Sequence, residues 1–198
     1  MLYHLVRLFF KPLTWIWFRP KIQNARALRQ RGKVIYVANH VSLTDPIAIG
    51  TLVPRSVHFM AKSPLFERPV ARVLLKLLLC FPVQQRVADR KSIAHAVELL
   101  NKGKAFGIFP EGHRSNPGED MDALDRGCAF IAVRADAPIV PIYIRYGKHF
   151  WNRLHAVVGD PILPDEVKAR CKTKRPVDAV TAAMTDAFLT LREAMESL

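Results

Sequence analysis

The sequence predicts an α/β fold in which a mixed, largely parallel sheet is flanked by helices. Three observations indicate this class. Short β-branched runs alternate along the chain with helical apolar patterns, as in repeated strand–helix units. Half of the residues are apolar and 24% are charged, which excludes a disordered chain. The length of 198 residues suits one domain that buries a core of its own.

Local patterns predict the elements in chain order. Residues 33–38 form a buried strand, and Asp45-Pro46 begins a helix, with Asp45 as its cap and proline at the first helical position. Further strands are expected at 57–60, 105–109, 139–145 and 155–158, and helices at 69–79, 89–100, 125–135 and 177–195. Residues 73–83 are apolar apart from Lys76 but too short to span the ~30 Å core of a bilayer. That stretch predicts a buried or membrane-dipping helix.

Basic residues are concentrated at the amino end of the chain. Lys and Arg number 30 against 17 Asp and Glu, and eight of the basic residues lie in residues 1–44, which contain no acid. Residues 1–18 are apolar and aromatic, with Arg7 and Lys11 on the opposite helical face. This combination is typical of a helix on an anionic membrane surface, and a helix that covers the core is the alternative. We therefore expect a helical membrane-association segment at 1–32, an α/β domain at 33–198, and a peripheral protein on the cytoplasmic face of the membrane.

The three cysteines are far apart and indicate neither a disulfide framework nor a zinc site. Chemically informative side chains instead follow two predicted strands, where open α/β sheets place their sites. The first loop, NHVSLTD at residues 39–45, holds His40 and Asp45. A carboxylate on one imidazole nitrogen fixes the tautomer and leaves the other nitrogen as a base. A turn histidine beside an ordinary helix cap is the alternative.

The second loop, FPEGHRS at residues 109–115, follows another predicted strand. It contains Arg114, whose planar guanidinium matches the geometry of a phosphate group. A polar surface turn is the alternative for this loop.

Together these loops resemble motifs of the glycerolipid acyltransferases, the family of bacterial 1-acylglycerol-3-phosphate acyltransferase. NHVSLTD is similar to the family's Asn-His-x4-Asp motif, and FPEGHRS is similar to its Phe-Pro-Glu-Gly-Thr-Arg-Ser block. Between them, FPVQQRVADRKS resembles the second block, and DRGCAFIAVRADAPIVPIYI resembles the later Arg-Gly and Val-Pro blocks. Four blocks in the family's order, within residues 33–145, make this resemblance specific.

The resemblance implies transfer of a fatty acyl chain from acyl-CoA or acyl-carrier protein to the free hydroxyl of a lysophospholipid. The acceptor it implies is 1-acylglycerol-3-phosphate, which would give phosphatidic acid. His40 would be the general base and Asp45 would orient it. Other matched positions would bind substrate (Arg86, Glu111, Gly112, Arg114 and Arg126) or support the site (Asn39, Ser42 and Pro141). It implies no cofactor and no metal; the expected partners are anionic lipids, the lysolipid and the acyl donor, without nucleic acid.

Two departures from the family pattern leave the acceptor headgroup open. His113 replaces the family's threonine, and Gln84-Gln85 replace an Asp-Arg pair, with Arg86 one residue later. A different lysolipid, such as a lyso-aminolipid, or acyl exchange between phospholipids is therefore an alternative. A non-catalytic membrane-binding protein on the same scaffold is an alternative of another class. A metal hydrolase, a hydrolase with Ser42 as nucleophile and a nucleic-acid binder have weaker support, because the sequence lacks their motifs.

Overall fold

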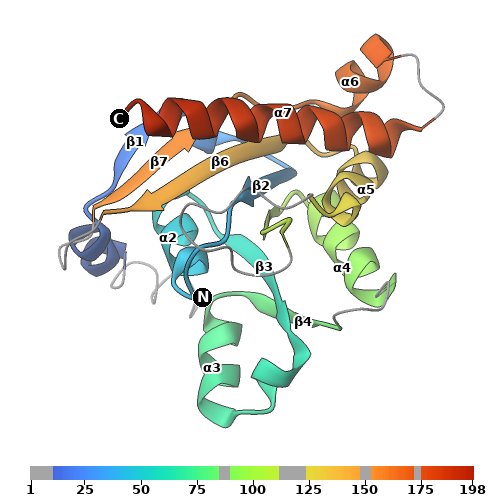
Figure 1. Ribbon diagram of the computed structural model, residues 1–198. Helices are drawn as coiled ribbons and strands as arrows, with labels where there is room; N and C mark the ends of the chain where they lie inside the picture. The colour runs from blue at the N-terminus through green and yellow to red at the C-terminus, as the bar shows by residue number, and fades with distance from the viewer. Residues whose placement is uncertain (1–10, 85–89, 112–123, 148–152, 172–174) are drawn as a thin grey trace.

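The fold is a sheet of seven strands in the order β1-β7-β6-β2-β5-β3-β4 (Figure 1). The computed structural model describes residues 11–84, 90–111, 124–147, 153–171 and 175–198. Neighbouring strands are parallel except for β6 and β7, which confirms the predicted mixed, largely parallel sheet. The strands are β1 (Lys21–Gln23), β2 (Val34–Ala38), β3 (Val57–Lys62), β4 (Cys80–Val83), β5 (Ala105–Ile108), β6 (Ile139–Tyr146) and β7 (Leu154–Val158).

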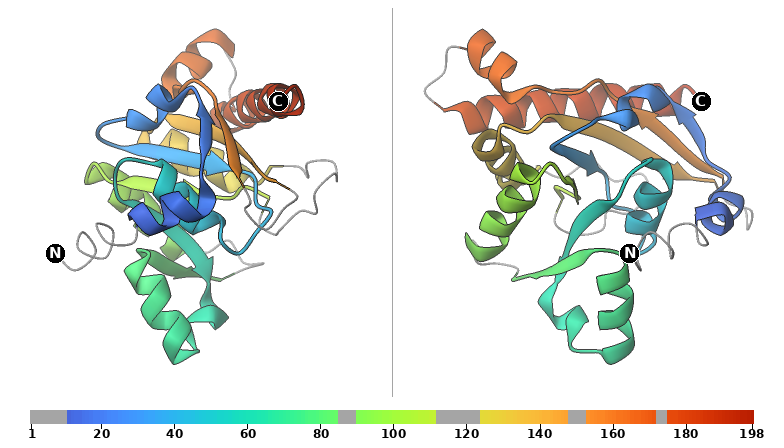
Figure 2. Two further views of the ribbon diagram at one scale, coloured as in Figure 1. Left: turned by 90° about the vertical axis from the view of Figure 1, so that its left-hand side faces the viewer. Right: turned by 180° about the vertical axis from the view of Figure 1, so that it is seen from behind.

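Helices cover both faces of the sheet, as Figures 1 and 2 show. Side chains of the central strand β2 alternate between two cores: Tyr36 points to one core and Val37 to the other. The first core also receives side chains from residues 11–18, η1 (Ala25–Arg29) and α2 (Asp45–Leu52). The second is closed by α4 (Arg90–Asn101), α5 (Arg126–Ala135) and the long α7 (Pro176–Glu196). The remaining helices are η2 (Ser63–Phe66), α3 (Pro69–Leu77) and α6 (Pro164–Cys171).

The carboxyl ends of β2, β5 and β6 meet at one edge of the sheet. In the parallel ladders Val37 lies opposite Ile108 on one side and Pro141 on the other. The residues that follow β2 and β5, and the last residues of β6, therefore converge. The two loops singled out in the sequence begin at this edge.

The prediction of one apolar helix from residue 73 to residue 83 is wrong beyond Leu77. Leu79 adopts a left-handed conformation with φ of 56°, which ends the helical path. Cys80 then begins β4, which pairs in parallel with β3 at the edge of the sheet. A short apolar stretch has no periodicity that separates a buried strand from a helix, and strand pairing decides it here.

The amino-terminal part of the described chain packs against the α/β domain. Residues 11–18 are helical, and β1 pairs in parallel with β7. Phe18 and Leu28 are buried in the core, so residues 18–28 of the expected membrane segment also contribute to the α/β fold. Among the described helices, none combines the length and the apolar content needed to cross a bilayer. Membrane association of the segment stays a prediction.

Candidate active site

Asn39 fixes the first loop where β2 leaves the sheet. Its side-chain amide donates to the Ile144 carbonyl at 3.0 Å, and its Oδ1 accepts from the Ile144 N–H at 2.7 Å. The side chain thus takes the place of a backbone peptide in pairing with β6. Because Asn39 is buried, this pairing satisfies polar groups that water does not reach. The backbone is free to turn out of the sheet at the next residue, His40.

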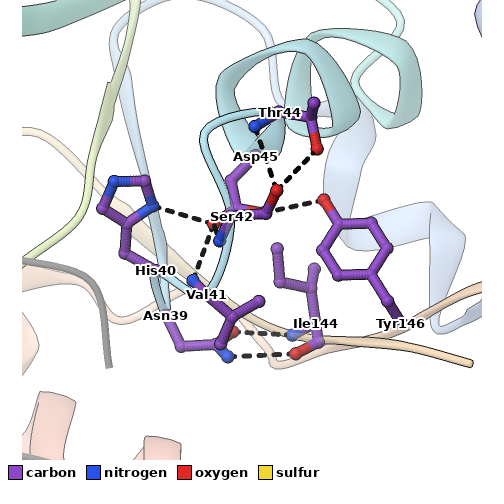
Figure 3. Close-up of polar contacts among 8 residues, drawn as sticks. All are labelled: Asn39, His40, Val41, Ser42, Thr44, Asp45, Ile144 and Tyr146. Atoms are coloured by element: carbon purple, nitrogen blue, oxygen red, sulfur yellow. Dashed lines mark hydrogen bonds and ion pairs between the residues drawn. The ribbon is translucent and has the colours of Figure 1, made fainter. Parts of the chain in front are cut away.

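His40 and Asp45 lie side by side in this loop (Figure 3). Nδ1 of His40 is 2.8 Å from Oδ2 of Asp45, whose side chain is completely buried while that of His40 is 19% exposed. Since a carboxylate only accepts hydrogen bonds, Nδ1 is the donor in this contact, and in a neutral imidazole the lone pair then lies on Nε2. This arrangement gives the imidazole a fixed orientation and a basic nitrogen.

Local backbone structure holds the carboxylate of Asp45. The backbone N–H groups of Val41 and Ser42 each donate to Oδ2 at 2.7 Å. Asp45 is the first residue of α2 and Thr44 is the N-cap, so the expected capping role of Asp45 is wrong. The carboxylate instead points back into its own loop, because the loop N–H groups and the imidazole all form hydrogen bonds to it there. Those two N–H groups are thereby occupied by Asp45.

Tyr146, at the end of β6, donates its hydroxyl to the other oxygen of Asp45, Oδ1, at 2.7 Å. In Figure 3 Tyr146 and His40 lie on opposite sides of the carboxylate. Burial, with the adjacent Asp45 charge and this hydrogen bond, raises the pKa of Tyr146 well above its usual value, so the phenol stays protonated. The sequence analysis missed Tyr146, which is 101 residues from its partner. The described groups give the Asp45 carboxylate four hydrogen-bond partners, which fix its position.

An aromatic stack supports the imidazole from the second loop. Phe109 stacks on His40 with ring centroids 4.4 Å apart, and Phe59 of β3 stacks beyond it at 6.0 Å. Gly107 in β5 makes room for Phe59, because a Cβ there would lie 2.3 Å from the Phe59 ring.

Only part of the predicted substrate-binding set lies within the described residues. Glu111 is buried in the loop that follows β5, after Phe109 and Pro110. Arg126 begins α5 and forms an ion pair with Asp178 of α7. Pro141 is a buried residue of β6 that pairs with β2. Arg86, Gly112, His113 and Arg114 lie outside the described residues, so their predicted roles stay predictions.

The geometry separates the rival chemistries of this loop. The hydroxyl of Ser42 pairs with the side chain of Thr44 at 2.9 Å, within its own turn. In the described parts of the chain, no three His, Cys, Asp or Glu side chains are close enough to hold a metal ion. The loop presents a buried carboxylate beside a partly exposed imidazole, an arrangement whose chemistry is compatible with removal of a proton from a hydroxyl.

Comparisons with known proteins assign the family. The profile of the Acyltransferase family matches residues 19–145, which include both loops and strands β1 to β5. The chain belongs to the Acyltransferase family. It is similar to a 1-acyl-sn-glycerol-3-phosphate acyltransferase of Bacillus subtilis, with 28% identity over 184 residues that cover 90% of each chain.

Two further relatives are informative. A lyso-ornithine lipid O-acyltransferase of Pseudomonas aeruginosa is 30% identical over 117 residues, 59% of this chain and 44% of that protein. The crystal structure of the 1-acyl-sn-glycerophosphate (LPA) acyltransferase PlsC from Thermotoga maritima has the same fold. Its TM-score is 0.71 at 21% identity, and the match covers 99% of this chain and 79% of that chain.

Proposed function

We propose that the protein transfers a fatty acyl chain from a thioester donor to the free hydroxyl of a lysophospholipid. The contact between His40 and Asp45 carries the proposal, because it creates a base within a chain of the Acyltransferase family. The acceptor we propose is 1-acylglycerol-3-phosphate, and the product is phosphatidic acid. Similarity to the Bacillus subtilis enzyme over 90% of both chains supports this acceptor.

The reaction proceeds in a single transfer. Nε2 of His40 takes the proton of the acceptor hydroxyl while the hydroxyl oxygen attacks the carbonyl carbon of the thioester. The tetrahedral intermediate then collapses and its C–S bond breaks. The imidazolium of His40 gives its proton to the leaving sulfur, which departs as a thiol. Asp45 stabilises the imidazolium that exists between these two proton transfers. The donor is acyl-CoA or acyl-carrier protein, and the protein itself is not acylated.

A lyso-aminolipid is the second acceptor worth testing. The chain is similar to a lyso-ornithine lipid O-acyltransferase over 59% of its length, and Gln84-Gln85 replace the family's Asp-Arg pair. The proton chemistry of His40 is the same for both acceptors, since each offers a free hydroxyl.

One assay separates the acceptors. Purified protein receives isotope-labelled acyl-CoA and, in parallel, lysophosphatidic acid, lysophosphatidylglycerol, lysophosphatidylethanolamine and a lyso-ornithine lipid, each dispersed in detergent. We expect labelled phosphatidic acid by mass spectrometry. A labelled ornithine lipid with unlabelled phosphatidic acid contradicts the first acceptor and supports the second. Absence of label from every product contradicts the proposed function.

We also propose that the helix of residues 11–18 binds the protein peripherally to the cytoplasmic face of an anionic membrane. Four of its apolar side chains point outward, Leu13, Trp15, Ile16 and Trp17, of which Ile16 and Trp17 are 66% and 65% exposed, and Phe18 alone is buried among the described residues of this helix. Its polar residue Thr14 faces the protein and accepts from Thr51 of α2 at 2.8 Å. A helix that merely covers the core would have the opposite orientation. Trp15→Gln with Trp17→Gln should weaken binding to anionic vesicles without removing the buried Phe18; unchanged binding contradicts the assignment.

A further inference from the structure

A second exposed apolar surface lies on α3 and on the turn η2 that precedes it. None of the nine residues of α3 is buried. Val70 is 73% exposed and Val73 is 58% exposed, with Leu74 and, in η2, Leu65 also exposed. Exposed aliphatic side chains that adjoin one another on one surface element indicate an interaction site.

The helix has an inner and an outer apolar face. Leu75, with Leu78 just beyond the helix, packs against the first core. At 100° per residue, Val70, Val73 and Leu74 fall on a different face from Leu75. The inner residues Leu75 and Leu78 pack α3 onto the domain beside β4 and η2. The outer face therefore serves some purpose other than folding.

Exposed apolar residues of the described chain are concentrated in one part of the fold. Nine of the thirteen large hydrophobic side chains that are exposed lie between Leu13 and Leu74, and the other four are scattered along α5, α6 and α7 and their ends. One of the nine is Leu43, which is 72% exposed in the loop that carries His40 and Asp45. Exposed apolar side chains thus include one residue of the loop that carries the candidate active site, Leu43.

Figure 1 and the right-hand view of Figure 2 show how these elements are arranged. Residues 11–18 lie beside α2, and α3 lies below α2, at the end of the molecule away from α7. The hydrogen bond from Thr51 to Thr14 confirms the first of these contacts. The helix α2, which begins with Asp45, thus lies between the two exposed apolar elements.

The charge around α3 favours an anionic surface. Residues 62–76 contain four basic residues and one acid. Arg68, Arg72 and Lys76 are exposed, and Nε of Arg72 donates to the carbonyl of Phe66 in η2 at 2.6 Å. Cations beside an exposed apolar face are what an interfacial helix requires, because the apolar side chains enter the bilayer and the cations stay at the phosphates.

We propose that η2 and α3 form a second membrane-contact surface, in which Leu65, Val70, Val73 and Leu74 enter the interface of an anionic phospholipid bilayer. The inference rests on the proposed function, since an enzyme that acts on a lipid works at a bilayer. Residues 11–18 and α3 then contact the membrane on either side of α2, so that the loop with His40 faces the lipid surface. A bilayer fits two separate apolar elements better than a protein partner does, because it deforms to both and needs no complementary shape.

Vesicle binding by the full chain tests the proposal. The variant carries Val70→Gln, Val73→Gln and Leu74→Gln, because glutamine keeps the helix and these side chains are not buried. The matched control carries Leu163→Gln, Leu189→Gln and Leu198→Gln, which are also exposed. With vesicles of phosphatidylcholine and phosphatidylglycerol, we expect the α3 variant to lose at least about tenfold in partition coefficient, equivalent to about 1.4 kcal/mol. The control should bind as the wild type does.

Equal binding by the wild type and the α3 variant would overturn the proposal, as would an equal loss in the control. A dimer in sedimentation that only the α3 variant dissociates would also overturn it and assign the surface to a second copy. Thermal melting checks that the variant is folded. Acyl transfer to detergent-dispersed lysolipid separates this test from that of the function: the α3 variant should keep wild-type turnover there, whereas failure of the proposed function leaves the wild type inactive.

A labelling experiment gives an answer that does not depend on the folding of the triple variant. Val73→Cys is made with Cys171→Ser, because Cys171 is exposed while Cys80 and Cys128 are buried. An environment-sensitive fluorophore on residue 73 should be quenched by lipids that carry a nitroxide on the acyl chain. Quenching by aqueous iodide to the same extent with and without vesicles would contradict insertion of α3.

Discussion

The hydroxyl of Tyr146 donates to Oδ1 of Asp45 at 2.7 Å, on the side of the carboxylate away from His40. This bond holds the carboxylate in the plane in which its other oxygen meets Nδ1. A hydrogen bond to a charged group contributes about 1.5–3 kcal/mol. Tyr146→Phe should therefore reduce kcat by about tenfold or more with little change in KM, because Tyr146 orients Asp45 and is placed away from the substrate.

Tyr36→Phe is the matched control for this prediction. Its hydroxyl is also buried and donates to the Leu28 carbonyl at 2.7 Å, in the same core but not at the dyad. Both variants should melt at lower temperature than the wild type. When both variants are fully folded, only Tyr146→Phe should have a lower kcat than the wild type. Equal kcat values for the two variants would show that Tyr146 contributes to stability alone.

Asn39→Ala should destabilise the whole fold. The substitution leaves the buried N–H and carbonyl of Ile144 without the two bonds that Asn39 supplies. Each unsatisfied buried group costs about 1–3 kcal/mol, so the loss of both bonds should lower the free energy of unfolding by about 2–6 kcal/mol in urea denaturation. A loss of activity with unchanged unfolding free energy would contradict the pairing role and give Asn39 a direct part in the chemistry.

Gly107→Ala tests the aromatic stack beneath His40. The added Cβ would lie 2.3 Å from the Phe59 ring, which is buried against Phe109. Overpacking of this kind costs about 1–3 kcal/mol, and the displaced ring disturbs Phe109 and through it His40. We expect the variant to have lower acyl-transfer activity than the wild type even at a temperature where it is fully folded, so that loss of stability does not account for the decrease. Gly50→Ala in α2 is the control, since no atom lies within 4 Å of its Cβ, and it should preserve the stack.

Alkaline pH should weaken the fold through Tyr36. Burial raises the pKa of Tyr36 to about 12, against the lowering effect of the nearby Arg55 charge. Its stabilising contribution is complete below the unfolded pKa of about 10 and is lost as the pH rises from there towards 12, by about 1.4 kcal/mol per pH unit. The difference in unfolding free energy between the wild type and Tyr36→Phe should be constant below that window and shrink within it. A difference that stays constant up to pH 11 contradicts the shift.

The strand and helix pattern of the sheet could be predicted because its signals are local. β-Branched runs predicted β2 and β6, and a short apolar run predicted β5. Residues 21–23 and 164–171 were missed because a strand of three residues and a helix of eight carry little periodicity. β1 forms only because β7 offers it an edge, which is tertiary information.

The contact between His40 and Asp45 could be anticipated because both residues belong to one short loop. Tyr146 and Phe59 could not, since each reaches the site from a distant strand. Nothing in the residues around Tyr146 distinguishes it from Tyr143 of the same strand until the sheet register is known. The direction of the apolar face of residues 11–18 was likewise open until the contact between Thr14 and Thr51 fixed the rotation of the helix.

The role of His40 as the general base is tested most directly by acyl transfer in His40→Ala. The assay follows labelled acyl chains from acyl-CoA into lysophosphatidic acid, with His95→Ala as control because His95 is exposed on α4. General base catalysis contributes about 10²–10⁴-fold, so His40→Ala should lose at least about 100-fold in kcat while its melting temperature stays near that of the wild type. Wild-type turnover by a folded His40→Ala protein would contradict the mechanism.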